Sequence, residues 1–199
     1  FQDSETAKNL LRAFAGESQA RNRYDFAANL CQKQELQAMA FIFQATAKQE
    51  QAHAKVFWDH LQALNGQNLP IYGAYPIEGT NRILELLRAA QHNEHEEHGS
   101  VYPSFAAIAT QEGFPEAAAS FRQIAAIEQL HGERFGLLAD QLESGALFVS
   151  QIETGWMCLN CGHTQNSLEA PKQCPVCNHG QGWFIRLELA PWSPVVKQT

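Results

Sequence analysis

Two near-copies of one pattern of glutamate and histidine constrain this 199-residue chain more than any other feature. In each copy a glutamate precedes a Glu-x-x-His pair by 33 or 34 positions, and the two pairs lie 78 positions apart: Glu17 with Glu50 and His53, and Glu94 with Glu128 and His131. Positions i and i+3 of a helix share a face, so each pair presents one carboxylate and one imidazole to a single point. The repeat predicts two helical halves that together hold a di-metal carboxylate site.

Four stretches have strong helix-forming composition and are separated by turn signals. They cover about 4–31, 35–64, 80–111 and 115–142. Short connections make the first two helices antiparallel neighbours, and likewise the last two. The middle connection, 67–79, breaks the helical pattern, and its extended length of about 50 Å is enough to return along a helix of about 45 Å. The predicted fold class is all-α, a four-helix bundle with one long crossover.

The candidate ligands are expected at one height in this bundle. Glu17 and Glu50 lie about 16 and 17 positions on either side of the first turn, near residue 33. Glu94, Glu128 and His131 lie about 16 to 18 positions from the second turn, near residue 112. Residues equally far from the turn of an antiparallel helix pair lie side by side. Both halves of the pattern should therefore meet in the middle of the bundle.

Charge balance also favours two metal ions. Four buried glutamates would be very costly alone, whereas two divalent cations neutralise them, and oxygen-rich ligation with two imidazoles suits iron or manganese. Glu97, one turn after Glu94, is either a surface glutamate or a fifth carboxylate that replaces a neutral imidazole when the metals are oxidised. Tyr24 and Tyr102 lie about two turns after Glu17 and Glu94, where they either pack in the core or hydrogen-bond to ligand carboxylates.

Other potential ligands have simpler explanations. His92, His95 and His98 could form a separate metal site, but their spacing moves them around the helix, so we expect them to face solvent. Cys31 has no base or partner cysteine near it in the sequence, and we expect a small buried thiol.

After Gly145 the sequence changes to short apolar clusters, glycines and cysteines, which predicts a second, small domain. We expect the bundle in residues 1–147 and the small domain in 148–199, with 191–199 as a terminal strap or a disordered tail. About 40 residues cannot bury enough apolar surface to fold unaided, so such a domain normally requires a metal.

The small domain contains two Cys-x-x-Cys pairs: Cys158 with Cys161, and Cys174 with Cys177. In a chain without secretion signals this spacing predicts a tetrahedral four-cysteine metal site rather than disulfides. Iron would make the site a one-electron carrier, and zinc would make it structural.

Composition excludes several classes of partner. The net charge of −7 provides no basic stripe for phosphates, so neither nucleic acid nor an anionic membrane surface is expected to bind. No apolar run approaches the roughly 20 residues of a membrane span, and no signal peptide is visible, so we expect a cytoplasmic protein.

The motifs together resemble the rubrerythrin family, over about residues 4–189. The resemblance rests on Ala-Gly-Glu-Ser-Gln-Ala-Arg-Asn-Arg-Tyr at 15–24, on the two Glu-x-x-His pairs, on Glu94-x-x-Glu97, on Tyr-Pro-Ser-Phe-Ala at 102–106, and on both cysteine loops. It implies a ferritin-like bundle with a non-haem di-iron centre, joined to a small C-terminal rubredoxin-like metal-ribbon domain that holds one iron. It also implies an NAD(P)H-linked hydrogen peroxide reductase, active in oxidative stress defence and supplied by a donor such as rubredoxin and its reductase. A homodimer is implied, in which the partner's rubredoxin-type domain approaches the di-iron site.

The resemblance also implies a role for each candidate residue. Glu50 and Glu128 would bridge the irons, Glu17 and Glu94 would be terminal ligands, His131 would hold one iron, and the other iron would exchange His53 for Glu97 on oxidation. Glu97, His53, Tyr24 and Tyr102 are the candidate catalytic residues.

Two residues depart from the family pattern. His163 stands where an aromatic residue often follows Cys-Gly, and Asn178 stands where a small residue is common. Asparagine tolerates left-handed backbone, so we expect the loop to keep its shape. The alternative function is a ferroxidase or iron-binding protein whose four-cysteine site is only structural.

Overall fold

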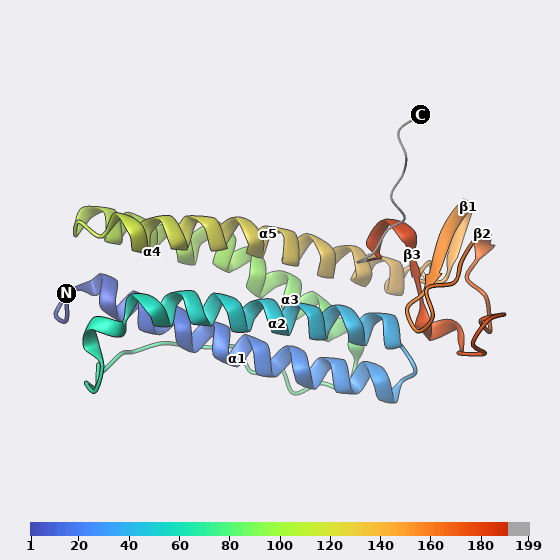
Figure 1. Cartoon of the computed structure of the whole chain (residues 1–199), viewed down its shortest axis with the longest axis horizontal. Helices are drawn as coiled ribbons and strands as arrows, with labels where there is room; N and C mark the ends of the chain where they lie inside the picture. Colours follow the sequence, from blue (N-terminus) through green and yellow to red (C-terminus); the bar gives the residue numbers. More distant parts are fainter. Residues whose placement is uncertain (191–199) are drawn as a thin grey trace.

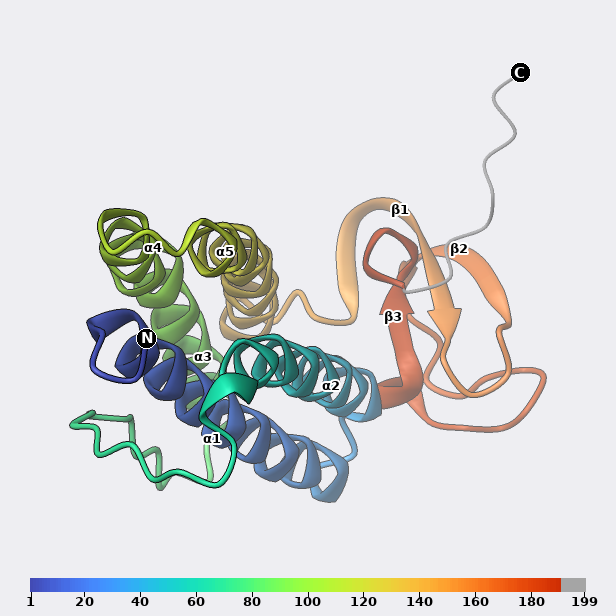
Figure 2. The same cartoon turned by 60° about the vertical axis from the view of Figure 1, so that its left-hand side comes forward.

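The computed structural model of the chain describes residues 1–190, so the strap or disordered tail expected at 191–199 lies outside the described residues. Two helical hairpins form the bundle: α1 (Glu5–Lys33) with α2 (Gln37–His60), and α3 (Ile83–Glu96) and α4 (Tyr102–Gln111) with α5 (Pro115–Glu143). Figures 1 and 2 show the hairpins side by side, with the segment between α2 and α3 running back along α1. A single-turn helix, η1 (Gln62–Leu64), precedes that segment. The predicted all-α bundle with one long crossover is confirmed.

The third predicted helix is not continuous. It begins at Ile83 rather than near residue 80, and a π-helical segment, η2 (Glu97–Val101), separates α3 from α4. Pro103 has no N–H to donate to the carbonyl of residue 99, and its ring would collide with that carbonyl in a regular α-helix. A π-turn relieves both problems, and such turns occur often at functional sites.

Helix α1 is capped by its own sequence and by a distant turn. Ser4 Oγ accepts a hydrogen bond from the Ala7 N–H at 3.1 Å. The Glu112 carboxylate, from the turn between α4 and α5, accepts from the N–H groups of Glu5 at 3.0 Å and Thr6 at 2.7 Å. A negative charge at a helix N-terminus also interacts favourably with the helix dipole. The turn of the second hairpin is thus fixed to the start of the first.

Replacing Glu112 with alanine should lower the free energy of unfolding at neutral pH by about 1 kcal/mol, the usual effect of losing a cap. The Thr6 hydroxyl, by its hydrogen bond, holds the pKa of Glu112 below its ordinary value. The carboxylate therefore stabilises fully above its unfolded-state pKa of about 4.3 and loses this effect as the pH falls through the lower folded-state pKa. Chemical denaturation of Glu112→Ala and of the exposed neighbour Gln111→Ala, at pH 7 and below pH 4, checks both statements. Equal midpoints for the two variants at pH 7 would contradict the cap.

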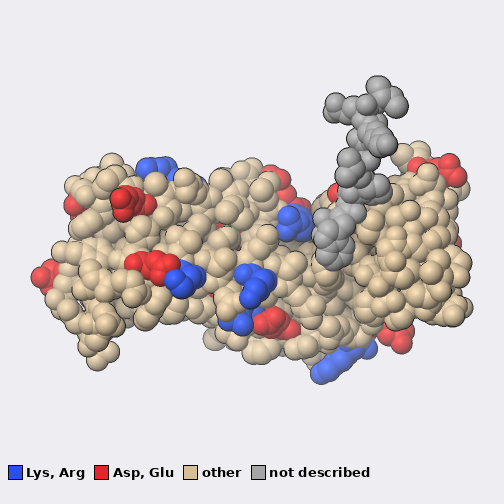
Figure 3. Space-filling view, viewed as in Figure 1, with Lys and Arg blue, Asp and Glu red and all other residues tan. Residues whose placement is uncertain are grey.

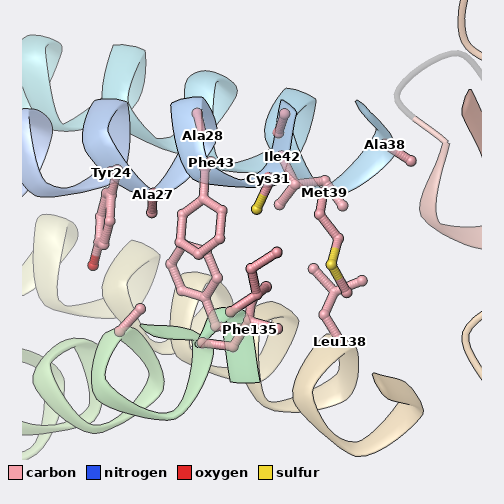
Figure 4. Packing of buried hydrophobic residues seen from close by; sticks show 14 of the residues in the cluster. Tyr24, Ala27, Ala28, Cys31, Ala38, Met39, Ile42, Phe43, Phe135 and Leu138 are labelled. Carbon is pink, nitrogen blue, oxygen red and sulfur yellow. The ribbon is translucent and has the colours of Figure 1, made fainter. Parts of the chain in front are cut away.

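The bundle core is aromatic on both sides of its middle. On one side the Phe43 ring lies 5.0 Å from that of Phe135, and Tyr24 lies 5.2 Å from Phe135 (Figure 4). On the other side Phe57 packs 5.1 Å from Phe121. These buried rings place apolar surface on both sides of the space between the two clusters, which lowers the local dielectric constant.

The small domain is a three-stranded antiparallel sheet of strand order β2-β1-β3. Its strands are β1 (Val149–Cys158), β2 (Thr164–Glu169) and β3 (Phe184–Arg186), and two short 3-10 turns, η3 (Gln181–Trp183) and η4 (Leu187–Leu189), flank β3. Trp156 and Phe184 are fully buried in its core beside two of the cysteines. The predicted ribbon-like metal domain is confirmed, whereas the boundary between residues 147 and 148 stays a prediction.

The sheet packs on the end of the bundle where α1 turns into α2 (Figure 1). Met157 and Ile185 of the sheet join the same buried cluster as Met39 and Leu138 of the bundle. Gly182 lies directly against the carbonyl oxygen of Glu35, where any Cβ would overlap backbone atoms. The absence of a side chain at this position permits the close contact.

Within residues 1–190, no helix combines the length and apolar character that a membrane crossing requires. Figure 3 shows acidic and basic side chains of the bundle interspersed on the visible face, without a continuous stripe of either sign.

Candidate metal centre

Six of the predicted ligands meet in the middle of the bundle in two overlapping groups. One group contains Glu17, Glu50, His53 and Glu128, and the other contains Glu50, Glu94, Glu128 and His131. The ligand atoms within each group lie within 4.8 Å of one another, and all these residues are buried. Glu50 and Glu128 belong to both groups, which is the arrangement that two bridging carboxylates would have.

The two imidazoles face the shared carboxylates in matching ways. His53 Nδ1 lies 3.1 Å from Glu50 Oε2 and 2.9 Å from Glu128 Oε1. His131 Nδ1 lies 3.0 Å from Glu50 Oε1 and 2.9 Å from Glu128 Oε2. The rings are stacked with centroids 5.8 Å apart. Each half of the repeat thus supplies one histidine to a site that is nearly symmetric.

Electrostatics show that this cluster requires positive charge. Five carboxylate oxygens are buried without a hydrogen-bond partner: Oε2 of Glu17, Oε1 of Glu50, Oε2 of Glu94, and both oxygens of Glu128. Burial raises the pKa of Glu17 well above its ordinary value and that of Glu94 to about 8. Burial opposes the charge of His131 too, but Glu128, Glu50 and Glu94 outweigh it and raise the pKa of that imidazole to about 11. The cluster must therefore hold protons or cations, and its oxygen and imidazole donors fit divalent iron or manganese.

A residue outside the predicted set orients His131. The Nε2 of His131 lies 2.9 Å from Oε1 of Gln49, an acceptor, so Nε2 carries the proton. When a metal ion replaces the proton on Nδ1, this hydrogen bond selects the tautomer whose Nδ1 lone pair faces the carboxylates, as a metal ligand requires. The repeat gives no signal for Gln49, because this contact joins α2 to α5 and depends on how the two hairpins pack.

The two tyrosines occupy equivalent positions in the two halves. Tyr24 donates its hydroxyl hydrogen bond to Oε1 of Glu94, and Tyr102 donates to Oε1 of Glu17. Burial, followed by the neighbouring carboxylates, raises the pKa of both phenols well above the ordinary value. Both hydroxyls therefore stay protonated and act as donors to the terminal carboxylates.

Glu97 lies next to the centre but belongs to neither four-residue group. It is the first residue of η2, and its Oε1 lies 3.9 Å from the point that a Cβ on Gly16 would occupy. Burial, followed by the charge of Glu94, raises its pKa well above the ordinary value. Glu97 is thus a half-buried carboxylate close to the cluster and not a fully exposed surface glutamate; its role as an exchanging ligand stays a prediction.

The three histidines near Glu94 do not converge on a site of their own within the described part of the chain. His92, whose side chain is 70 % exposed and lies 3.6 Å from Glu96, and His95 face solvent as expected. The expectation was wrong for His98, which is half-buried because its Nδ1 donates to the carbonyl of Ala125 at 2.9 Å. Cys31 is fully buried, and burial raises the pKa of its thiol to about 12, as expected of an inert cysteine.

The four cysteines of the small domain converge as predicted. Sulfur atoms of Cys158 and Cys177 lie 3.7 Å apart, those of Cys161 and Cys174 lie 3.6 Å apart, and all four lie within 4.8 Å of one another. This spacing suits a tetrahedral thiolate site for iron or zinc.

The two cysteine loops have matching backbones. Gly162 N–H donates to the carbonyl of Cys158 at 2.8 Å, and Asn178 N–H donates to that of Cys174 at 2.9 Å. Gly162 has φ 77° and Asn178 has φ 60°, so the asparagine adopts the expected left-handed conformation. The backbone N–H of His179 holds the pKa of Cys177 down at about 5, which favours a thiolate ligand.

Comparison with known proteins agrees with both sites. The family model described as Rubrerythrin matches residues 8–139, and the model for the rubrerythrin rubredoxin-like domain matches 156–185. Rubrerythrin of Porphyromonas gingivalis is 45 % identical over 91 % of this chain and 89 % of its own length; that of Nitratidesulfovibrio vulgaris is 40 % identical over 94 % and 96 %.

Solved structures share the fold. Nigerythrin in its mixed-valence state superimposes with a TM-score of 0.61 over 92 % of this chain and 90 % of its own, at 24 % identity. Mycobacterium tuberculosis bacterioferritin superimposes with a TM-score of 0.62 over 71 % of this chain and 88 % of its own, at 18 % identity. The chain belongs to the rubrerythrin family, with a carboxylate and histidine cluster suited to two irons and a rubredoxin-like four-cysteine site suited to one more.

Proposed function

We propose that this protein reduces hydrogen peroxide to water at the carboxylate and histidine centre, with electrons delivered through the four-cysteine site. One observation carries the proposal: a single chain combines a buried centre for two metal ions with a thiolate site suited to one-electron transfer. The reaction takes up two electrons and two protons, breaks the O–O bond, and releases two water molecules. A ferroxidase has no need of a dedicated source of electrons, so the second site favours the reductase.

In this proposal two irons would be held by six residues: Glu50 and Glu128 would be shared between them, Glu17 and Glu94 would be terminal ligands, and His53 and His131 would each hold one iron. When bound, the two irons supply the two electrons that reduce the O–O bond. The protein holds the ligands rigidly, because the tyrosine hydroxyls fix both terminal carboxylates and Gln49 fixes the His131 ring. Because the ligands are already in position, less free energy is needed to rearrange them when the charge of the centre changes.

Glu97 is the proposed moving ligand. It is half-buried and lies beside Gly16, next to the ligand Glu17, and only the second half of the repeat carries such an extra carboxylate. An added carboxylate compensates an added positive charge, so Glu97 would replace the neutral His53 when the centre is oxidised. Tyr24 and Tyr102 stay protonated at neutral pH and keep hydrogen bonds on the terminal carboxylates throughout.

Electrons are proposed to arrive from a second copy of the chain. Glu17 lies 16 residues before the end of α1 at Lys33, a distance of about 24 Å along the helix. The small domain packs beyond that end (Figure 1), far from the centre of its own chain. A homodimer that brings the partner's small domain beside the centre would shorten this path. The electrons would come from an NAD(P)H-dependent reductase through a carrier such as rubredoxin.

The proposal predicts that hydrogen peroxide reoxidises the fully reduced protein faster than oxygen does. Stopped-flow absorbance, with each oxidant at equal concentration, measures both rates on iron-loaded protein. The visible band of an Fe(III)-thiolate site should bleach on reduction and return after peroxide is added. A faster reaction with oxygen, or a colourless zinc-loaded four-cysteine site in protein isolated from its natural source, would favour the ferroxidase or iron-binding alternative.

A further inference from the structure

A small chamber lies beneath the crossover, beside the metal centre. It has a volume of about 220 Å³. Its walls include Ala13, Gly16, Tyr75, Glu97, Val101 and Tyr102. Two of these residues lead directly to the centre: Glu97 is the proposed moving ligand, and Tyr102 hydrogen-bonds to Glu17. The chamber therefore joins the protein surface to the side of the centre where the ligand exchange is proposed.

The outer wall of the chamber is formed by residues 72–78 of the crossover. Contacts with α1 hold this segment, called the crossover strap below, in place. At one end Arg12 Nε donates to the carbonyl of Tyr72 at 2.9 Å, and the Tyr75 hydroxyl donates to the carbonyl of Arg12 at 3.0 Å. At the other end Arg23 forms an ion pair with Glu78 at 2.8 Å. Both of these charged side chains are largely buried, so solvent screens the pair only in part. These contacts thus hold the crossover strap in place on both sides of Tyr75.

Tyr75 rests against the bare backbone of Gly16. Its ring carbon Cε1 lies 3.6 Å from the point that a Cβ on Gly16 would occupy, and the Glu97 carboxylate lies 3.9 Å from the same point. Tyr75 is 39 % exposed, so the residue reaches from the surface to the space beside Glu97, and the missing side chain at Gly16 leaves that space open. A water molecule takes up about 30 Å³, so the chamber of about 220 Å³ has room for about seven molecules of that size. It is smaller than the pockets of roughly 300 Å³ or more that take drug-sized ligands.

We propose that Tyr75 determines which oxidants reach the centre: the ring admits molecules about the size of hydrogen peroxide and excludes bulky organic hydroperoxides. The inference rests on the proposed peroxide reduction and assigns the entry route of that site. Tyr75 acts by occupying space, and its hydroxyl bond to Arg12 fixes the position of the ring.

Tyr75→Ala tests the proposal, with Tyr72→Ala as the matched control on the same crossover strap. The side chain of Tyr72 is 86 % exposed, and the contact of this residue with Arg12 uses its backbone carbonyl. In Tyr75→Ala the ratio of the reoxidation rate with cumene hydroperoxide to that with hydrogen peroxide should rise about tenfold or more, the usual scale of size discrimination by a pocket. In Tyr72→Ala the ratio should stay as in the wild type. An unchanged ratio in Tyr75→Ala overturns the assignment.

A second measurement does not depend on peroxide chemistry. Val101→Cys places a thiol in the chamber wall, and mass spectrometry follows its labelling by methyl methanethiosulfonate and by a bulky fluorescein maleimide. Adding Tyr75→Ala to Val101→Cys should speed labelling by the bulky reagent about tenfold relative to the small one, and adding Tyr72→Ala should not. Equal relative rates in all backgrounds would show that Tyr75 does not control access. If labelling responds as expected while peroxide fails to oxidise the reduced protein, the proposed function fails and the entry route stands.

Discussion

Replacing Glu97 with glutamine should lower peroxide turnover by about 10- to 100-fold, the usual effect of removing a group that supports metal ligands. The amide keeps the size of the side chain but cannot supply the negative charge that an oxidised centre would attract. Both irons should remain bound, because each four-residue group is complete without Glu97. Steady-state kinetics and metal analysis on the same preparation check the two parts of this prediction.

Glu133→Gln is the matched control for Glu97→Gln, since it makes the same chemical change on the exposed face of α5. Its turnover and iron content should equal those of the wild type. If Glu97→Gln instead lost one iron per chain, Glu97 would be a permanent ligand. If its turnover stayed normal with both irons bound, the proposed exchange with His53 would be wrong.

Replacing Cys174 with alanine should unfold the small domain while the bundle stays folded. The sheet core is small and is built around the cysteines themselves, since Cys158 and Cys174 are fully buried beside Trp156. Metal binding by four thiolates stabilises small domains by about 10–16 kcal/mol at neutral pH, which is more than a core of this size supplies. Losing one ligand should therefore abolish the visible absorption band of the iron-thiolate site. It should also unfold the residues beyond β1.

Limited proteolysis and the visible spectrum measure this effect, and Val176→Ala serves as the control. Val176 lies in the same Cys-x-x-Cys loop but is 65 % exposed, so its removal should leave both the spectrum and the protease resistance unchanged. A Cys174→Ala protein that kept a protease-resistant small domain would show that packing against Met39 and Leu138 suffices to fold it.

The spacing of the glutamates and histidines in the repeat was enough to predict the metal centre. Counting from each turn placed Glu17 opposite Glu50 and Glu94 opposite Glu128, because α-helices have a constant rise, and the structure brings all four together. The four-cysteine site was equally accessible from sequence, since two short loops and their spacing determine its geometry. Asn178 was also predictable, because asparagine is among the few residues that adopt left-handed backbone readily.

Features that depend on contacts between distant elements were not predictable in this way. Gln49 orients His131 across the bundle, and Glu112 caps a helix more than a hundred positions away in the sequence. The π-turn at Glu97 interrupts a stretch with ordinary helical composition, so the third helix was expected to be continuous. The crossover strap acquires its role only when the crossover lies along α1 and brings Tyr75 to Gly16.

The contacts of the centre run from one half of the chain to the other, and this determines when the centre can form. Tyr24 binds Glu94 and Tyr102 binds Glu17, across 70 and 85 positions of sequence. Each four-residue group likewise draws three members from one hairpin and the fourth from the other. Neither hairpin alone holds a full ligand set as it leaves the ribosome. Iron uptake must therefore follow synthesis and docking of the second hairpin, and a truncated chain would have no complete place to bind it.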